Sequence, residues 1–363
     1  MITAVEQLQQ VLRDHMLEQE ADAALVTSPQ NRLYLTGFPS SAGWVLITQQ
    51  KSYFITDFRY FEAAERHVKS CEVVLMSRLS ENLREIVQAH GIKNVLVEYA
   101  GLSLADAKNY RDMFGTMGVQ TVEDSTLDRL LRGLRAIKTP QELQKLRDSQ
   151  AITDAAFSHV LPMLRPGLTE REVALEIEFF MRRSGAEGVA FELIVVSGAN
   201  GSMCHGVPSE KKIESGDLVT MDIGALLDGY HSDMTRTVGI GHLSEEQKRV
   251  YHTVLAAQLA AIEKAAPGVV CSEVDCAARE IIDKDYPGTF GHSTGHGVGV
   301  EIHEWPNFAP SCQEVLQPGM VVTVEPGIYL PGKFGVRIED MIAITEDGCE
   351  DLTASDKSLL IIE

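Results

Sequence analysis

Two acidic residues bracket a stretch that could bind a metal ion. Asp222 and Asp233 stand at the two ends of a β-hairpin pattern, in which apolar and β-branched runs flank the turn residues Asp228 and Gly229. The midpoint of the two aspartates falls between Leu227 and Asp228, so we expect them nearly opposite each other, within a one-residue bulge. Carboxylates about 5 Å apart repel each other unless a proton or a cation lies between them. The hairpin therefore predicts a metal site.

A second hairpin pattern repeats this arrangement near the end of the chain. Glu325 and Glu339 are equally far from Gly332, which lies in a Pro-Gly turn. Between the two hairpins, residues 291–304 form a glycine-spaced histidine cluster. If the hairpins pack together, four carboxylates and at least one imidazole converge. That set of ligands is typical of a two-metal site that activates water.

The local sequence strengthens this interpretation. An aspartate near a turn is usually solvated or caps a helix. Asp222 and Glu325, however, lie in otherwise apolar runs, where an ionised side chain is expelled unless it is paired or bound. Arg337 is expected on the same face as Glu339, either as an anchor for a ligand carboxylate or simply as its ion-pair partner.

Four histidines are candidates for the same site. His296 lies between two glycines, which lets its imidazole approach a metal closely. A lone histidine such as His205 is more often structural than catalytic. His292, His296 and His303 fall within twelve residues, and this clustering favours a role in chemistry. Imidazoles beside a metal site could hold a substrate carbonyl and stabilise an oxyanion.

Composition bounds the class of protein. The 363 residues suit about two domains, and 44% hydrophobic with 23% charged residues is typical of a soluble globular chain. The formal charge of −20 argues against nucleic acid or an anionic membrane as a partner. No charged, apolar leader and no run of about 18 apolar residues is seen, so we expect a cytoplasmic protein. Six scattered cysteines without a CxxC pair argue against a disulfide framework or structural zinc.

The first third of the chain has the pattern of an α/β domain. An amphipathic helix is expected within residues 1–20, from Val5, Leu8, Val11, Leu12 and Met16. Short strand-like runs then alternate with helical patterns at residues 61–68 and 79–90. The strand-like runs cover residues 24–27, 44–48, 53–56, 72–75 and 94–98.

A helix restarts at Thr139, where Pro140 and Glu142 complete the pattern of a helix N-terminus. We place a domain boundary here, between residues 1–137 and 138–363. Beyond it, helical patterns and hairpins alternate twice in the same order. This order predicts an internal pseudo-two-fold repeat with the site at its seam. The helical patterns cover residues 139–157, 169–183, 243–265 and 274–285.

These residues together resemble the aminopeptidase P and prolidase family, the Xaa-Pro metallopeptidases of the pita-bread fold. The resemblance covers residues 139–363 throughout, and residues 31–38 and 56–60 more loosely. It implies a creatinase-like α/β N-terminal domain followed by an α+β pita-bread catalytic domain. It rests on Asp222, Asp233, His296, Glu325 and Glu339, with the motifs HG at 205–206, GHGVG at 295–299, HE at 303–304, EPG at 325–327 and RIED at 337–340.

The resemblance also implies a ligand set for two divalent ions. Asp233 and Glu339 would bridge the ions, Asp222 would complete the shell of the second ion, and His296 and Glu325 that of the first. Manganese is the usual metal of the family, with cobalt or zinc as alternatives, which suits oxygen-rich ligands with one imidazole. Members are usually homodimers or larger.

Catalytic and substrate-binding roles follow from the same resemblance. Glu325 would take a proton from the attacking water. His205 and His303 would bind the substrate carbonyl and the intermediate, and His292 would shape the pocket around proline. We also expect Arg337 to be one of the residues that bind substrate.

The expected activity is removal of an N-terminal residue from a following proline. Such an imide bond offers no N–H, so general proteases bind it badly. A dipeptidase restricted to Xaa-Pro is the nearest alternative. A methionine aminopeptidase would not need the N-terminal domain, and creatinase-like enzymes use the fold without metals. A peptide-binding module on an inactive fold would have lost metal ligands, and all five are present here.

Overall fold

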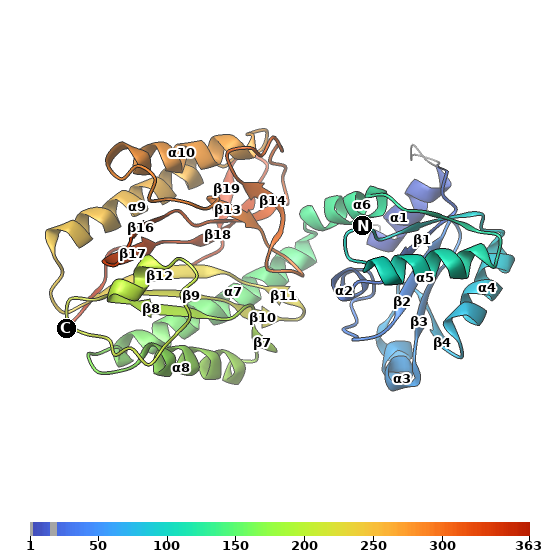
Figure 1. Ribbon diagram of the computed structural model, residues 1–363, viewed down its shortest axis with the longest axis horizontal. Coiled ribbons are helices and arrows are strands. Elements are labelled where there is room, and N and C mark those ends of the chain that lie inside the picture. The colour runs from blue at the N-terminus through green and yellow to red at the C-terminus, as the bar shows by residue number, and fades with distance from the viewer. Residues whose placement is uncertain (1–2, 15–19) are drawn as a thin grey trace. The chain divides into compact units, whose positions relative to one another are not determined.

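The computed structural model describes residues 3–14 and 20–363 (Figure 1). The chain divides into two compact units, residues 1–135 and 136–363. The first unit ends two residues before the sequence-based limit at residue 137, which stays a prediction. Each unit has its own core.

The first unit contains a six-stranded sheet with the order β4-β3-β2-β1-β5-β6. β1, β2 and β3 are antiparallel neighbours, whereas β4, β5 and β6 join in parallel. The five predicted strands are all present; β6 is short and was not predicted. The strands are β1 (Ala23–Val26), β2 (Trp44–Thr48), β3 (Ser52–Thr56), β4 (Glu72–Leu75), β5 (Asn94–Val97) and β6 (Gln120–Val122).

Helices cover both faces of this sheet. Alternate residues of β1 enter opposite core clusters, Ala24 and Val26 one and Ala23 and Leu25 the other, as the pleat of a strand requires. The predicted α/β class is therefore confirmed. Within the predicted first helix, Met16 lies outside the described residues. The helices are α1 (Ala4–Arg13), α2 (Pro29–Thr36), α3 (Phe58–His67), α4 (Leu79–His90), α5 (Leu104–Gly115) and α6 (Thr126–Ala136).

The second unit repeats one order twice, a helix pair followed by strands. Its strands lie between the α7–α8 pair and the α9–α10 pair (Figure 1). Thr139, Thr169 and Ser244 close capping boxes at α7, α8 and α9, and each such cap contributes about 1 kcal/mol to stability. None of the described helices is long and apolar enough to cross a membrane. The helices are α7 (Pro140–Val160), α8 (Glu170–Arg183), α9 (Glu245–Lys264) and α10 (Cys271–Asp285).

Two larger sheets form the centre of this unit, with the orders β20-β12-β9-β8 and β14-β13-β15-β18-β19. A three-stranded sheet, β11-β10-β7, and a two-stranded sheet, β16-β17, extend them. The strands of the first half are β7 (Gly188–Val189), β8 (Ile194–Ser197), β9 (Leu218–Ile223), β10 (Ala225–Leu227), β11 (Tyr230–His231) and β12 (Met234–Ile240). Those that follow are β13 (Gly295–Gly297), β14 (Glu304–Phe308), β15 (Val321–Val324), β16 (Gly327–Leu330), β17 (Phe334–Arg337), β18 (Asp340–Ile344), β19 (Cys349–Asp351) and β20 (Ile361–Ile362).

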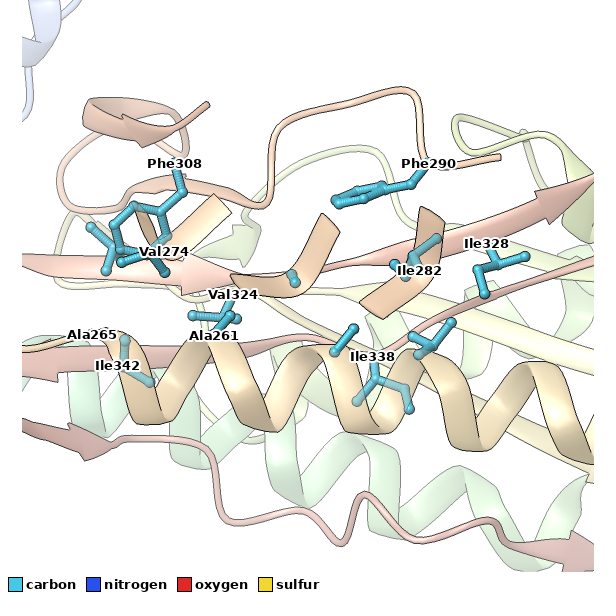
Figure 2. Close-up of a cluster of buried hydrophobic side chains, with 14 of the residues drawn as sticks. Ala261, Ala265, Val274, Ile282, Phe290, Phe308, Val324, Ile328, Ile338 and Ile342 are labelled. Atoms are coloured by element: carbon cyan, nitrogen blue, oxygen red, sulfur yellow. The ribbon is translucent and has the colours of Figure 1, made fainter. Parts of the chain in front are cut away.

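Each half packs its strands on its own helix pair. Figure 2 shows side chains of α9, α10 and the strands of the second half meeting in one apolar cluster, among them Val274, Ile282, Val324 and Ile342. In the first half, Met221 and Ile223 of β9 pack with residues of α7 and α8. Because side chains alternate along a strand, residues next to these buried positions face away from the helices. The acidic positions 222 and 325 are such neighbours, and position 339 follows Ile338 of the same apolar cluster.

Candidate metal centre and active site

The first hairpin turns at Asp228 and Gly229, whose φ values are 48° and 74°. Two successive residues with positive φ are typical of a type I′ turn, the usual two-residue hairpin connection. The register that follows pairs Asp222 with Thr235. The expectation that Asp222 lies nearly opposite Asp233 is therefore wrong by two residues, because the turn is centred one residue later than expected. Alternation still leaves residues 233 and 235 on one face.

The second hairpin has the predicted register. Val324 pairs with Asp340, and Gly327 pairs with Arg337. Both pairs are centred on residue 332, where Gly332 has a φ of 72°. Continuing this register places Glu325 opposite Glu339. The turn chemistry of the sequence was sufficient to find this pair.

Three side chains from distant parts of the sequence converge. Asp233, His296 and Glu339 each offer a ligand atom, and these atoms all lie within 4.8 Å of one another. Glu325 joins them, because His296 Nε2 lies 3.5 Å from Glu325 Oε1 and 3.5 Å from Asp233 Oδ2. Asp233 and Glu339 are only 4% and 1% exposed. Both hairpins and β13 thus contribute to one buried acidic cluster.

The imidazole of His296 is held in one tautomer. Its Nδ1 lies 3.0 Å from the carbonyl oxygen of Gly297, which can only accept, so Nδ1 carries the proton. Burial lowers the pKa of His296 to about 4. The ring is therefore neutral near pH 7, and the lone pair of Nε2 faces the carboxylates. This is the form in which histidine binds metals.

Gly295 matters because of backbone packing. A Cβ at Gly295 would lie 1.9 Å from the carbonyl oxygen of Thr323 in β15. The backbone N–H of His296 also donates to Thr323 Oγ1 at 3.1 Å. Gly295 was expected to give the backbone beside His296 conformational freedom. In the structure it lets β13 approach β15 closely, and this close approach fixes the position of His296.

The carboxylates destabilise one another in the absence of a cation. Burial, and next the charges of neighbouring carboxylates, raise the pKa values of Asp233 and Glu339 well above their ordinary range. Burial raises the pKa of Glu325 to about 8, although the charge of Arg337 opposes this shift. A divalent cation would replace the protons that such a cluster otherwise binds.

Arg337 bridges the two hairpins. The guanidinium is buried, and its Nη2 donates to Asp222 Oδ2 at 2.6 Å. Its Nε donates to Thr235 Oγ1, and its Nη1 donates to the hydroxyl of Tyr329 and the carbonyl of Cys204. The ion pair considered with Glu339 is not formed; the partner is Asp222 of the other hairpin. These contacts indicate an anchor for Asp222 rather than a group that reaches substrate.

The remaining oxygen of Asp222 is unusual. Asp222 Oδ1 is buried and has no hydrogen-bond partner among the described residues. A buried carboxylate oxygen without a donor costs free energy unless something binds it. This oxygen fits a metal ligand, as do the lone pair of His296 and the repelling carboxylates around it.

His292 lies at the edge of the cluster. Its Nδ1 is 2.8 Å from the carbonyl of Ser293, and its Nε2 is 2.8 Å from the hydroxyl of Tyr329. Burial lowers the pKa of His292 to about 4, so this imidazole is also neutral near pH 7. Tyr329 thus joins His292 to Arg337. No local signal in the sequence pointed to Tyr329.

His205 and His303 are the exposed members of the group. The ring of His303 lies 4.4 Å from that of His296, edge to face. His205 follows Cys204, whose carbonyl accepts from Arg337. Both imidazoles therefore extend from well-anchored segments towards solvent.

Two helix carboxylates hold the loops that carry histidines, and the sequence did not reveal them. Glu170 of α8 is fully buried and accepts from Ser197, Asn200 and Ser209, on both sides of His205. In α10, Asp275 accepts from the backbone and hydroxyl of Thr294 and from Arg279. Arg279 in turn donates to the carbonyl of His292. Each half of the repeat thus uses a helix carboxylate to order a loop of the site.

Comparison with known families decides the class. The model of metallopeptidase family M24 matches residues 144–346, and that of the creatinase/prolidase N-terminal domain matches residues 9–137. The chain belongs to metallopeptidase family M24. The predicted creatinase-like domain and pita-bread fold are confirmed.

Individual M24 relatives align over nearly the whole chain. An Xaa-Pro dipeptidase of Pyrococcus furiosus is 37% identical over 350 residues, 95% of this chain and 97% of the relative. The solved structure of an Xaa-Pro dipeptidase from Bacillus anthracis has a TM-score of 0.92 at 41% identity, covering 99% of both chains. An X-Pro aminopeptidase from Thermotoga maritima has a TM-score of 0.90 at 35% identity, covering 99% of this chain and 100% of that one. M24 membership implies a hydrolase that uses divalent metal ions.

Proposed function

We propose that this M24 metallopeptidase hydrolyses the bond between an N-terminal residue and a following proline. The main observation behind the proposal is the buried cluster of carboxylates around the neutral imidazole of His296, whose Nε2 faces them. The names of the relatives, Xaa-Pro dipeptidase and X-Pro aminopeptidase, supply the substrate class.

Five residues would hold two divalent ions. Asp233 and Glu339 are almost fully buried and offer ligand atoms within 4.8 Å of each other, which supports the proposal that both ions would share them. His296 Nε2 and Glu325 Oε1 lie 3.5 Å apart and would bind the same ion, and Asp222, whose Oδ1 has no hydrogen-bond partner in the described part of the chain, would complete the set. Oxygen-rich ligands with one imidazole favour manganese, with cobalt or zinc as alternatives. When bound, the ions supply a Lewis acid and a water that is nucleophilic near neutral pH.

The other side chains have distinct roles in this proposal. Glu325 takes the proton of the attacking water. His205 and His303 are exposed beside the cluster and donate hydrogen bonds to the scissile carbonyl as it becomes an oxyanion. His292 shapes the wall of the proline pocket, and Arg337 anchors Asp222.

Substrate length has two candidates. The names of the relatives give somewhat more support to a dipeptidase, since those at 37% and 41% identity carry that name. A dipeptidase must hold a free carboxylate next to proline. Arg337, the arginine that contacts Asp222, directs its donors to protein atoms instead. This second observation favours the aminopeptidase hypothesis, which was also the prediction from the sequence.

Paired substrates test both points. Metal-stripped enzyme is assayed on an Xaa-Pro dipeptide and the matching Xaa-Pro-Yaa tripeptide, each with and without manganese. Manganese-dependent cleavage of the tripeptide supports the aminopeptidase mode, and cleavage of the dipeptide alone supports the dipeptidase mode. Cleavage of neither, with any divalent ion, contradicts the proposal.

The setting of the enzyme is also part of the proposal. We propose a homodimer in the cytoplasm, as the family resemblance implies, with peptides as substrates. The net charge of −20 argues against nucleic acid or an anionic membrane as a further partner. Sedimentation or light scattering of the purified chain measures the oligomer directly.

A further inference from the structure

An ion pair buried beside the histidine cluster has no role in the function proposed above. The Nζ of Lys138 lies 3.1 Å from Oε2 of Glu304, and the two side chains are 1% and 3% exposed. Removing both charges from water costs several kcal/mol per ion, so such a pair is weak evidence for stability alone. Glu304 directly follows His303 in the HE motif. This position raises the question of what the pair does for that histidine.

The carboxylate of Glu304 organises the segment that leads to His303. Its Oε1 accepts from the backbone N–H of Glu301 at 3.2 Å. A Cβ on Gly299 would lie 2.5–2.6 Å from the carboxylate, so the chain closes around this group. The backbone of His231 also donates to the carbonyl of Gly299 at 2.9 Å. Residues 299–304 thus form a loop folded around one charged group.

Lys138 fixes that group from outside the loop. The backbone N–H of Lys138 donates to the carbonyl of Gly319 at 2.8 Å, and Ile137 forms a bridge with Met320. These contacts hold the lysine beside the start of β15. Its ammonium therefore reaches Glu304 from a backbone that is itself anchored in the central sheet.

His303 needs such support because it is exposed. Apart from the edge-to-face contact with His296, solvent surrounds much of its side chain. The direction of the imidazole therefore depends on the backbone of residues 301–304. We propose that the Lys138–Glu304 pair is a positioning device that aims His303 at the scissile carbonyl. This inference rests on the role given to His303 in the proposed function.

The test uses the double variant Lys138→Met/Glu304→Gln, which removes both charges of the pair. In the metal-loaded enzyme kcat falls about 10- to 100-fold, a typical loss when a residue that supports a site is removed. KM and the bound metal measured by elemental analysis change less than about twofold. The matched control is Arg147→Met, which breaks the exposed Arg147–Glu350 pair of α7 and leaves kcat unchanged.

The decisive measurement repeats the double variant in a His303→Ala background. If the pair acts through His303, it lowers kcat there by less than about twofold, because the group it aims is absent. An equal loss in both backgrounds overturns the inference and assigns the pair a structural role. Unchanged kcat in the otherwise wild-type enzyme also overturns it. Failure of the proposed function is distinguishable, because the wild-type enzyme would then cleave no Xaa-Pro peptide.

Discussion

Asp222 shows at the scale of one residue how this site is built. One carboxylate oxygen accepts from Arg337, and the other has no partner among the described residues. The arginine compensates part of the charge and fixes the side chain, while the second oxygen is left available. A carboxylate needed only for stability would have both oxygens satisfied. The residue is therefore anchored on one side and open on the other, as a metal ligand must be.

Asp233→Asn is expected to remove metal and activity while the chain stays folded. Loss of a residue that only supports a metal site typically lowers activity about 10- to 100-fold, and loss of Asp233 should lower it further. Without metal, the variant should be more stable than the wild type by at least about 1 kcal/mol, since one repelling buried carboxylate is gone. Elemental analysis, peptide hydrolysis and thermal unfolding check the three parts.

Asp228→Asn is the matched control for that variant. It lies at the turn of the same hairpin, is exposed, and has a φ of 48° that asparagine tolerates. Metal content and activity should not change. An active, metal-free Asp233→Asn enzyme would sink the metal assignment.

His303→Ala should keep the metal and lose turnover. Loss of one donor to an oxyanion typically lowers kcat about 10²- to 10³-fold. His252→Ala, an exposed histidine on α9, is the control and should behave as the wild type. Steady-state kinetics with metal analysis measures both, and unaltered kcat/KM in His303→Ala would show that the oxyanion role is misplaced.

At the scale of elements, the close approach of β13 and β15 sets the place of His296. Gly295→Ala brings a methyl group against the carbonyl of Thr323, where an ideal Cβ would lie 1.9 Å away. We expect a loss of about 1–3 kcal/mol in stability and weaker metal binding, because the strands must separate. Gly291→Ala meets no atom within 4 Å and should be nearly neutral. Equal metal affinity in the two variants would contradict this account of β13.

Local chemistry explains which elements the sequence predicted. The helix-start pattern at Thr139 marked the beginning of α7, and the Pro-Gly turn at Gly332 gave the register of the second hairpin. In the first hairpin, the predicted turn centre was one residue too early, so the predicted pairing was wrong by two residues. The prediction placed the turn at the midpoint between Asp222 and Asp233. A type I′ turn instead requires positive φ at both central residues, which are Asp228 and Gly229 here.

Long-range contacts explain what the sequence did not predict. Glu170 holds Ser197 and Ser209, which are 27 and 39 residues away, and Asp275 holds Thr294. Tyr329 meets His292 only after the hairpin folds against α10 and its loop. None of these residues differs locally from an ordinary helix or strand residue. Helix α5 and strand β6 were likewise not found, since their local patterns are weak.

At the scale of the whole molecule, the two halves of the second unit each pack their strands on one helix pair and present acidic residues on the opposite face. The protein thus has a buried acidic cluster, in a chain whose net charge is already −20. Divalent ions bound at the seam would relieve repulsion that the apolar cores of the two halves must otherwise overcome. Metal binding and stability of the catalytic unit should be linked.

This linkage has a predicted pH dependence. Burial raises the folded-state pKa of Glu325 to about 8 from an ordinary value of 4.5, and raises those of Asp233 and Glu339. Groups with a raised pKa stabilise the fold fully below pH 4.5, and this stabilisation is lost as pH rises towards 8. Metal-free protein should therefore lose stability across this range. Thermal unfolding at several pH values measures the slope, which should flatten when manganese is present.

The most direct test is a metal titration of stripped wild-type enzyme, with bound ions counted while hydrolysis of an Xaa-Pro peptide is followed in the same samples. We predict that activity is absent without metal and reaches its maximum as two divalent ions bind per chain. Full activity in the stripped enzyme, or binding of ions with no hydrolysis of any Xaa-Pro peptide, would contradict the assignment of this chain as a metal-dependent Xaa-Pro peptidase.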